Sequence, residues 1–310
     1  MPILAIDLGG TRAKLGLVEG GRVLAHAIVD LGTAQGLEGL LPRLGLALEK
    51  ICAEQGFKAA AAQGLAFGFP GLVDPQRQRV LATNKKFDDA VGLDLPAWAR
   101  SRWGLPLRLE NDARLALLGE WQCGAGRGCD DLVMLTLGTG VGSAVLMDGR
   151  LLTSRHFQAG SLGGHFVVDL NGPLCGCGNR GCVEAVASTW AVEAQRGPVP
   201  QGGAQGYERL FQDAQAGDAE AQALKAKSLE AWAAAIITLI HAYDPERVIV
   251  SGGVMQRAAE ILPFLRQRVA ERAWTPGRRV DVAVAEQPDL AALLGGAVLF
   301  QSPVGLEARP

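Results

Sequence analysis

The sequence predicts an α/β protein with two mixed β-sheets flanked by helices. The main observation is a strand–turn–strand pattern that occurs twice, over residues 3–29 and residues 132–153. Each copy has a strand, a turn rich in glycine and threonine, a second strand, a tight turn and a third strand. Stretches with helical spacing follow each copy, so we expect two similar lobes that face each other.

The two turns rich in glycine are candidate phosphate loops, at residues 7–11 and 137–142. Backbone N–H groups that no Cβ shields favour anions, and threonine hydroxyls can add hydrogen bonds. Glycine-rich hairpin turns are common, and neither copy is the lysine-containing P-loop or the dinucleotide fingerprint. Because the turns recur in matching surroundings, we expect them to hold one polyphosphate from both sides.

The further elements of the first half follow from hydrophobic spacing and turn residues. Leucines at helical spacing predict a helix within residues 35–55, and Pro42 marks its start. Asp94 caps another helix that has Pro96 in its first turn. The other expected elements are a strand at 63–69, an extended pair at 72–73 and 80–81, a strand at 107–110 and a helix at 113–121.

The second half becomes mostly helical after residue 183. Residues 154–182 carry little regular pattern, and Gly197–Gly206, with two prolines, is expected to be a surface loop. The expected elements are helices at 183–194, 218–241, 256–272 and 290–300 and strands at 247–251 and 280–284.

Composition is that of a globular protein without export signals. The 310 residues are enough for one large domain or two ordinary ones. A net charge of −2 argues against a general nucleic-acid binder, which needs a basic surface to neutralise phosphates. The chain starts directly with a strand, and its most apolar stretch, residues 231–243, is shorter than a bilayer span of roughly 20 residues. We therefore expect a cytoplasmic protein with no membrane or nucleic-acid partner.

Three of the six cysteines form a compact motif. Cys175, Cys177 and Cys182 lie within eight residues, and His165 precedes them by ten. Three thiolates and one imidazole make a complete tetrahedral ligand set for a structural zinc ion, whereas disulfides are rare in the cytosol. The alternative is three incidental thiols beside a turn, which the compact spacing disfavours.

Asn111-Asp112 lies where a strand ends and a helix begins. Asn and Asp commonly cap helices at such a junction, and spacing alone favours that interpretation. The functional alternative is that Asp112 accepts a proton from a hydroxyl that attacks a γ-phosphate. A carboxylate suits this role, since phosphoryl transfer needs an oriented nucleophile more than a strong base.

Two further positions carry both a structural and a functional interpretation. Glu184 follows the cysteine cluster, either as a first-turn glutamate that suits the helix dipole or as a ligand of a substrate hydroxyl. Ser251–Gly253 is either a tight strand-to-helix turn or a close approach of the backbone to a nucleotide at the carboxyl edge of a sheet.

Together these motifs resemble the ROK family of sugar kinases and repressors over nearly the whole chain. The segments that carry the resemblance are Asp7–Thr11, Gly68–Gly71, Glu110–Ala113, Leu137–Gly142 and the cysteine cluster with Gly164, His165 and Glu184. The resemblance implies a two-lobe duplicated ribonuclease-H-like fold of the actin-like ATPase type, with mixed sheets, flanking helices and a zinc-braced loop. It implies a small N-terminal lobe of residues 1–112 plus about 290–310 and a larger C-terminal lobe of residues 113–289, which close over ATP.

The resemblance also implies the site residues. Asp112 would be the general base, Asp7 would position Mg²⁺ through water, and Gly252-Gly253 would border the adenine. The sugar ligands would be Gly68, Asn84, Asn111, Asp112, His165 and Glu184. The ATP and Mg²⁺ site would comprise Asp7, Gly9, Gly10, Thr11, Lys14, Gly138, Thr139, Gly140, Gly252 and Gly253. Structural Zn²⁺ would be held by His165, Cys175, Cys177 and Cys182.

One position departs from the family pattern. The family usually reads Gly-Glu-x-Gly-His before the zinc cluster, and Leu162 stands where that sugar-binding glutamate is expected. A leucine cannot accept a hydrogen bond, and a buried hydroxyl without a partner costs about 1–3 kcal/mol. The preferred sugar would therefore lack a polar group there, present it differently, or bind Ser161, Gln158 or His156 instead.

The function implied by the resemblance is an ATP-dependent sugar kinase, with the 6-hydroxyl of glucose as the default acceptor. Because of Leu162, the alternatives are fructose, an N-acetylhexosamine, allose or a cyclitol, and polyphosphate is the alternative donor. A sugar-responsive repressor is disfavoured because the sequence begins at the phosphate strand, without a helix-turn-helix segment. A non-catalytic actin relative is disfavoured by the zinc-braced polar loop, and the family suggests a homodimer.

Overall fold

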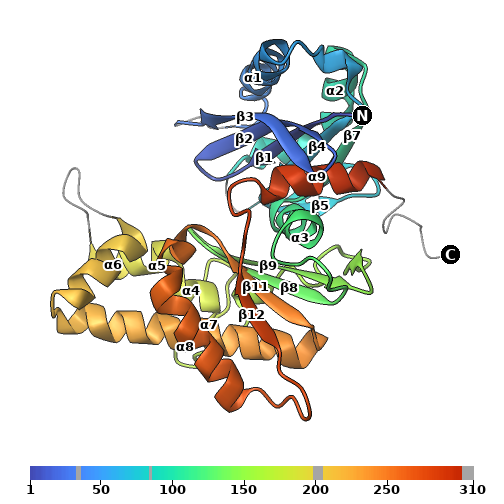
Figure 1. Ribbon diagram of the computed structural model, residues 1–310. Coiled ribbons are helices and arrows are strands. Elements are labelled where there is room, and N and C mark those ends of the chain that lie inside the picture. The colour runs from blue at the N-terminus through green and yellow to red at the C-terminus, as the bar shows by residue number, and fades with distance from the viewer. Residues whose placement is uncertain (33–35, 84–85, 198–204, 302–310) are drawn as a thin grey trace. The chain divides into compact units, whose positions relative to one another are not determined.

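The chain forms two compact units in the computed structural model, which describes residues 1–32, 36–83, 86–197 and 205–301 (Figure 1). Unit 1 comprises residues 1–128, residues 153–158 and the chain from Gln287 onward, and unit 2 comprises residues 129–152 and 159–286. Each unit has a five-stranded mixed sheet with helices packed on it, so the α/β class with two mixed sheets is confirmed.

The sheet of unit 1 has the strand order β3-β2-β1-β4-β7. Its strands are β1 Ile3–Leu8, β2 Arg12–Glu19, β3 Arg22–Asp30, β4 Leu65–Phe69 and β7 Leu107–Asn111. The first three strands pair antiparallel, whereas β4 runs parallel to β1 and β7 runs parallel to β4. The carboxyl ends of β1, β4 and β7 therefore lie at the same edge of the sheet. A separate hairpin pairs β5 Leu72–Asp74 with β6 Arg79–Ala82.

Helices cover both faces of this sheet, as Figure 1 shows. They are α1 Leu41–Glu54, α2 Leu95–Trp103, α3 Asp112–Cys123 and α9 Ala291–Gln301, with short 3-10 turns η1 Ala59–Ala61 and η2 Asp88–Gly92. Side chains alternate along a strand, so Leu4 and Ile6 of β1 join the core that includes α1 and α2. Ile3 and Ala5 point the other way and join the core built with α9.

Helix α3 packs tightly against α9 in unit 1 (Figure 1). A Cβ on Gly119 of α3 or on Gly295 of α9 would overlap backbone atoms of the other helix, so glycine permits the close approach. Through this contact unit 1 extends to Gly128, whereas the sequence interpretation ended the first lobe at Asp112. The partner helix α9 comes from the far end of the chain, which no local pattern reveals.

The sheet of unit 2 repeats the pattern of unit 1, with the strand order β10-β9-β8-β11-β12. Its strands are β8 Leu132–Leu137, β9 Val141–Met147, β10 Arg150–Leu151, β11 Arg247–Ser251 and β12 Asp281–Val284. Strands β8, β9 and β10 pair antiparallel in that order. Strand β11 runs parallel to β8, and β12 runs parallel to β11. The predicted repeat is therefore present as a repeated strand order.

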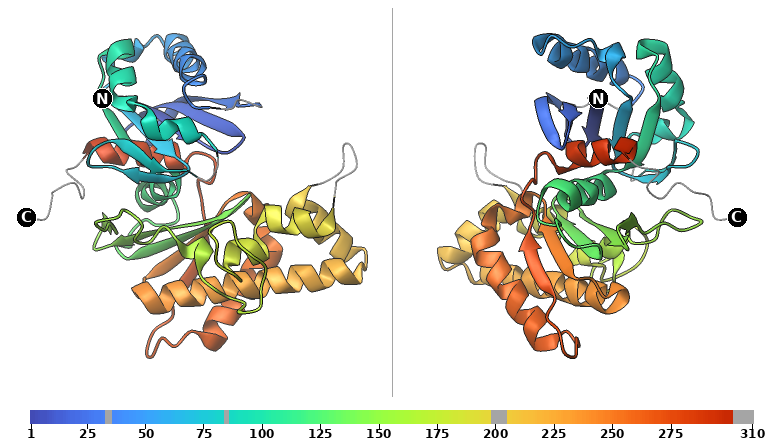
Figure 2. Two further views of the ribbon diagram at one scale, coloured as in Figure 1. Left: turned by 180° about the vertical axis from the view of Figure 1, so that it is seen from behind. Right: turned by 45° about the vertical axis from the view of Figure 1, so that its right-hand side comes forward.

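The helices of unit 2 include the long α7 and the neighbouring α8, which Figure 2 shows from two sides. The helical elements are η3 Gly163–His165, α4 Val183–Ala187, α5 Thr189–Arg196, α6 Gly206–Gln215, α7 Ala219–Tyr243, η4 Gly253–Arg257 and α8 Ala258–Arg272. The expected helix at 183–194 was wrong, because the extended backbone of Ser188 divides it into α4 and α5. Ser188 Oγ accepts a hydrogen bond from Ala191 N and so caps α5.

Helix α6 was not expected, since the sequence pattern predicted no helix between residues 194 and 218. The expected loop Gly197–Gly206 lies mostly outside the described residues. Within the described ranges, no helix combines the length and apolar character needed to cross a membrane.

Glu120 connects two segments at the border of unit 1. Its side chain is buried, Oε2 accepts a hydrogen bond from Ala125 N at 2.8 Å, and Oε1 accepts one from Gln287 N at 2.7 Å. Both segments adjoin positions where the chain passes between the units, at Gly128 and at Gln287. The Glu120 carboxylate therefore fixes the backbone of unit 1 next to two positions where the chain passes to unit 2.

Replacement of Glu120 by alanine should destabilise the protein by about 2–4 kcal/mol, because two backbone N–H groups lose their acceptor. Urea unfolding measures this change. The matched control is Glu19→Ala, which removes only an exposed contact with the N-terminus and should change stability by less than about 0.5 kcal/mol. Equal stabilities of Glu120→Ala and the control would refute the role of this carboxylate.

Candidate active site and metal site

The strand register of unit 1 aligns the predicted site residues at one sheet edge. Asp7 of β1 pairs with Gly68 of β4, and Gly68 pairs with Glu110 of β7. Asp112 follows directly after β7 as the first residue of α3. A Cβ on Gly68 would come within 3.0 Å of the Leu115 side chain, so glycine lets α3 lie close to the middle strand.

Asn111 holds the carboxylate of Asp112 in place. Asn111 Oδ1 caps α3 by accepting a hydrogen bond from Arg114 N at 3.2 Å. Its Nδ2 donates to Asp112 Oδ1 at 3.0 Å and to Gly71 O at 3.2 Å. Asp112 Oδ1 also accepts from Ala113 N at 2.8 Å. The capping function therefore belongs to Asn111, and Asp112 is oriented by its neighbours without being the cap.

The environment of these carboxyl groups disfavours their charged forms. Burial raises the pKa of Asp112 to about 7, and the nearby negative charge of Asp7 acts in the same direction. Burial also raises the pKa of Asp7 to about 6, although the ammonium of Lys14 opposes the change. A carboxyl group with a pKa near neutrality can both take up and release a proton under physiological conditions.

The first glycine-rich turn uses part of its backbone to close itself. Gly9 N donates to Arg12 O at 2.9 Å, so this N–H stabilises the turn between β1 and β2. Gly10 and Thr11 are exposed at its tip. Lys14 lies opposite Asp7 on β2, and its Nζ is 3.1 Å from Asp289 Oδ1.

The second turn has a matching closure in unit 2, where Gly138 N donates to Gly140 O at 3.0 Å. The first N–H groups of α5 bind the same turn, since Thr189 N donates to Gly138 O. Glu184 Oε2 accepts a hydrogen bond from Val141 N at 2.9 Å. The carboxylate of Glu184 is thus in direct contact with the end of this turn.

The Ser251–Gly253 turn lies beside the end of β8. Ser251 of β11 pairs with Thr136 of β8, so the two parallel strands end together. Gly252 has φ 98°, and a Cβ there would overlap the backbone of Leu137. Only glycine fits this position, which agrees with the tight strand-to-helix turn expected from the sequence.

The four predicted zinc ligands lie together in unit 2. One ligand atom from each of His165, Cys175, Cys177 and Cys182 lies within 4.8 Å of the others. Cys177 Sγ is 3.7 Å from Cys182 Sγ, and Cys175 Sγ is 3.7 Å from His165 Nδ1. Zinc–sulfur bonds of about 2.3 Å in a tetrahedron give sulfur–sulfur edges of about 3.8 Å. The donor set and its spacing therefore fit a tetrahedral zinc ion.

The thiols of this cluster differ in how readily they ionise. Burial raises the pKa of Cys182 to about 12 and also raises that of Cys175. The backbone N–H of Asn179 lowers the pKa of Cys177. Because metal binding requires thiolates, a bound cation would offset the cost of ionising the two buried thiols.

The segment before the cluster is fixed by Ser143, whose Oγ donates to Gly160 O and accepts from Gly163 N, both at 2.7 Å. Leu162, at the departure from the family pattern, is 44% exposed. Ser161 Oγ is buried and has no hydrogen-bond partner among the described residues. Buried polar atoms usually have a hydrogen-bond partner, and a bound ligand would supply one for Ser161 Oγ.

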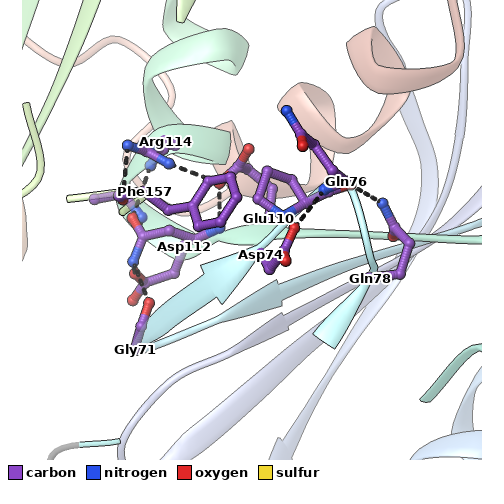
Figure 3. A network of polar contacts seen from close by, with 11 residues as sticks. Gly71, Asp74, Gln76, Gln78, Glu110, Asp112, Arg114 and Phe157 are labelled. Carbon is purple, nitrogen blue, oxygen red and sulfur yellow. Dashed lines mark hydrogen bonds and ion pairs between the residues drawn. The ribbon is translucent and has the colours of Figure 1, made fainter. Parts of the chain in front are cut away.

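Sequence reasoning missed Arg114, which is almost completely buried beside Asp112. Arg114 Nη1 lies 3.4 Å from Glu110 Oε1, and Nη2 donates to Phe157 O at 3.1 Å (Figure 3). The available signal was an arginine within an otherwise apolar helical stretch, four residues after a glutamate.

The predicted site residues thus fall into two groups. Those in unit 1 are Asp7, Gly9, Gly10, Thr11, Lys14, Gly68, Asn111 and Asp112. Those in unit 2 are Gly138, Thr139, Gly140, His165, Cys175, Cys177, Cys182, Glu184, Gly252 and Gly253. Asn84 lies outside the described residues.

Replacement of Asp112 by asparagine should change how stability depends on pH. The folded-state pKa of Asp112 is about 7 and its ordinary value is 3.8, so the folded protein binds this proton more strongly than the unfolded chain. The resulting stability is fully present below pH 3.8 and is lost as the pH rises through 7. Asp112→Asn cannot ionise, so its stability relative to wild type should increase from pH 4 to pH 8 in magnesium-free buffer.

Urea unfolding at several pH values measures this difference. Asp289→Asn serves as the control, because Asp289 is largely exposed and should give a curve parallel to wild type. A parallel curve for Asp112→Asn would contradict the raised pKa.

Comparison with known proteins gives consistent matches over the full length. The family model described as "ROK family" matches residues 3–302. The glucokinase of Thermotoga maritima is 33% identical over 98% of this chain and 99% of its own. The N-acetylmannosamine kinase of Yersinia pestis is 33% identical over 95% of this chain and 97% of its own. A crystal structure of a ROK family glucokinase from Streptomyces griseus, in complex with glucose and AMPPNP, superposes with a TM-score of 0.79 at 28% identity and covers 96% of this chain and 99% of its own.

Proposed function

The chain belongs to the ROK family, and we propose that this carbohydrate kinase transfers the γ-phosphate of ATP to a hydroxyl of a hexose with Asp112 as the general base. The observation that carries the proposal is the position of Asp112. Its carboxylate follows β7 at the sheet edge where β1 ends in Asp7 and the first glycine-rich turn. The proposed base and a candidate phosphate loop therefore lie at the same edge of the unit 1 sheet.

The role of Asp112 is to orient the attacking hydroxyl and to take its proton. Hydrogen bonds from Asn111 and Ala113 fix Oδ1, so the carboxylate keeps one orientation. A pKa of about 7 suits a group that accepts a proton near neutral pH. The proposed acceptor is the 6-hydroxyl of glucose, and the names of the Thermotoga maritima and Streptomyces griseus relatives support the choice of glucose.

The phosphates of the nucleotide are proposed to bind the two glycine-rich turns. In the first turn Gly10, Thr11 and Lys14 would contact them, because Gly9 N already closes the turn. In the second, Thr139 and Gly140 would do so. The Gly252-Gly253 turn would border the adenine. Asp7 fits a role toward Mg²⁺ as a carboxylate at the strand end, and a bound Mg²⁺ would neutralise phosphate charge.

Glu184, His165, Asn111 and Gly68 are proposed to bind the sugar, together with Asn84 from outside the described residues. An N-acetylhexosamine is the alternative acceptor, supported by the name of the Yersinia pestis relative. Among the three candidate replacements for the glutamate missing at Leu162, Ser161 offers a buried hydroxyl that a sugar could pair. A screen of ADP release over hexoses, N-acetylhexosamines and polyols, repeated with Ser161→Ala, would identify the sugar and test this contact.

A structural zinc ion is proposed at His165, Cys175, Cys177 and Cys182. It would cross-link the irregular segment that precedes α4, and so stabilise the positions of His165 and Glu184. A cytoplasmic location is proposed as well, since ATP as the donor requires access to the cytoplasmic nucleotide pool. The family resemblance is the basis for also proposing a homodimer. Analytical ultracentrifugation would decide the oligomeric state.

Asp112→Asn should lower the turnover number by about 10²–10⁴-fold, the range that a general base contributes. Sugar binding measured by calorimetry should largely survive, because the amide keeps the shape and the hydrogen bonds of the side chain. The control is Asp94→Asn, which changes only the cap of α2 and should keep wild-type rates. Turnover by Asp112→Asn within tenfold of wild type would refute the assignment.

Zinc removal should lower the melting temperature by about 5–10 °C, because the metal binds only the folded segment. Mass spectrometry of the purified protein should find one zinc ion per chain, and Cys177→Ser should lose it. Cys129→Ser, which changes a cysteine outside the cluster, should retain the metal. A wild-type protein without zinc, and with a melting temperature that chelators do not change, would contradict the proposal.

A further inference from the structure

The buried ion pair Glu110–Arg114 has no part in the mechanism proposed above, although it adjoins Asp112 (Figure 3). Glu110 is 4% exposed and Arg114 is 1% exposed. Removing two charges from water costs more than their attraction returns unless further hydrogen bonds complete the arrangement. The further hydrogen bonds of Glu110 and Arg114 therefore indicate which segments the pair holds in place.

The additional hydrogen bonds of this pair reach two different segments. Glu110 Oε1 accepts from Asn111 N at 2.8 Å, which fixes the backbone of the residue that orients Asp112. Arg114 Nη2 donates to Phe157 O at 3.1 Å. The pair thus connects the β7–α3 junction with the segment of residues 153–158.

Residues 153–158 belong to unit 1, although the chain on both sides of them belongs to unit 2. Within this segment Phe157 has φ 59°, a left-handed conformation that costs a bulky residue about 1–3 kcal/mol. Such a conformation persists only where the surroundings impose it. Phe157 N donates to Ser154 O at 3.0 Å, and the Phe157 carbonyl accepts from Arg114.

The residues on either side of Phe157 are polar. His156 and Gln158 both have exposed side chains. They lie on a segment whose carbonyl is bound by a residue two positions after Asp112. Since the attacking hydroxyl must approach Asp112, a segment held at this junction is suited to contact the same sugar.

We propose that Arg114 is a positioning residue for the phosphoryl transfer, which holds the segment of residues 153–158 at the Asp112 junction so that the segment helps to bind the sugar. This inference rests on the proposed kinase function. The bond to Phe157 O gives Arg114 a role beyond neutralising Glu110, and that role can be measured separately.

The decisive variant is the double replacement Glu110→Gln with Arg114→Met, which leaves no unpaired buried charge and removes the bond to Phe157 O. The matched control is Glu49→Gln with Arg102→Met, because this pair joins α1 and α2 of the same unit with a distance of 2.8 Å. Hydrogen exchange at the Phe157 amide reports the order of the segment. Steady-state kinetics over a panel of sugars reports its function.

In the double variant, exchange at the Phe157 amide and the KM for the sugar should each rise about tenfold or more, the effect of losing a hydrogen bond from a charged group. The KM for ATP should stay within about twofold, because no nucleotide contact is removed. The control pair should change neither quantity. Unchanged exchange, or faster exchange with an unchanged sugar KM, would overturn the inference.

Arg114→Lys provides a second test if the double variant does not fold. Its ammonium keeps a charge opposite Glu110 but lacks the planar fork that reaches two acceptors. The same rise in exchange and in sugar KM is expected, and wild-type values would overturn the inference. If the wild-type protein phosphorylates no sugar, the proposed function fails, whereas the exchange comparison still decides whether Arg114 holds the segment.

Discussion

The burial of two carboxyl groups at one sheet edge, Asp7 and Asp112, is the constraint on which the proposed site in unit 1 depends. Each group is costly to ionise in its surroundings, and the charge of Asp7 makes the ionisation of Asp112 more costly still. The fold supplies partial compensation through Lys14 near Asp7 and through the N–H groups of Asn111 and Ala113 at Asp112. The burial that suits Asp112 to the proposed proton transfer therefore also lowers stability as the pH rises.

The repeated strand order provides two sheet edges that carry different residues. In unit 1, Asp7 lies near the end of β1 and Asp112 directly follows β7, and carboxylates suit the proposed proton transfer and a divalent cation. In unit 2, Gly138 follows β8 and Gly252 follows β11, and Gly252 lets the backbone approach β8 closely. Glu184 adds a carboxylate from α4 instead of from a strand. The same strand order thus places buried acidic side chains at the sheet edge of unit 1 and a close backbone approach at that of unit 2.

Much of this arrangement could be predicted from local patterns. The hairpin repeats, the cysteine cluster and the Asn111-Asp112 junction are short motifs whose residues determine their own geometry. The division of residues 183–194 could not be predicted, because it depends on one extended residue, Ser188, within an otherwise helical pattern. The packing of α3 on α9 and the bond from Arg114 to Phe157 join positions far apart in the chain. Such contacts leave no periodic signal in the sequence.

The raised pKa values of Asp7 and Asp112 can be measured by titrating the aspartate side-chain carboxyl carbons by NMR in labelled, magnesium-free protein. A signal that is absent from Asp112→Asn should titrate with a pKa of about 7, and a second should titrate at about 6 and move to a lower pKa in that variant. If the Asp112 signal instead titrated near its ordinary pKa of 3.8, burial would not disfavour the charged form of this carboxyl group, which contradicts the constraint proposed for this sheet edge.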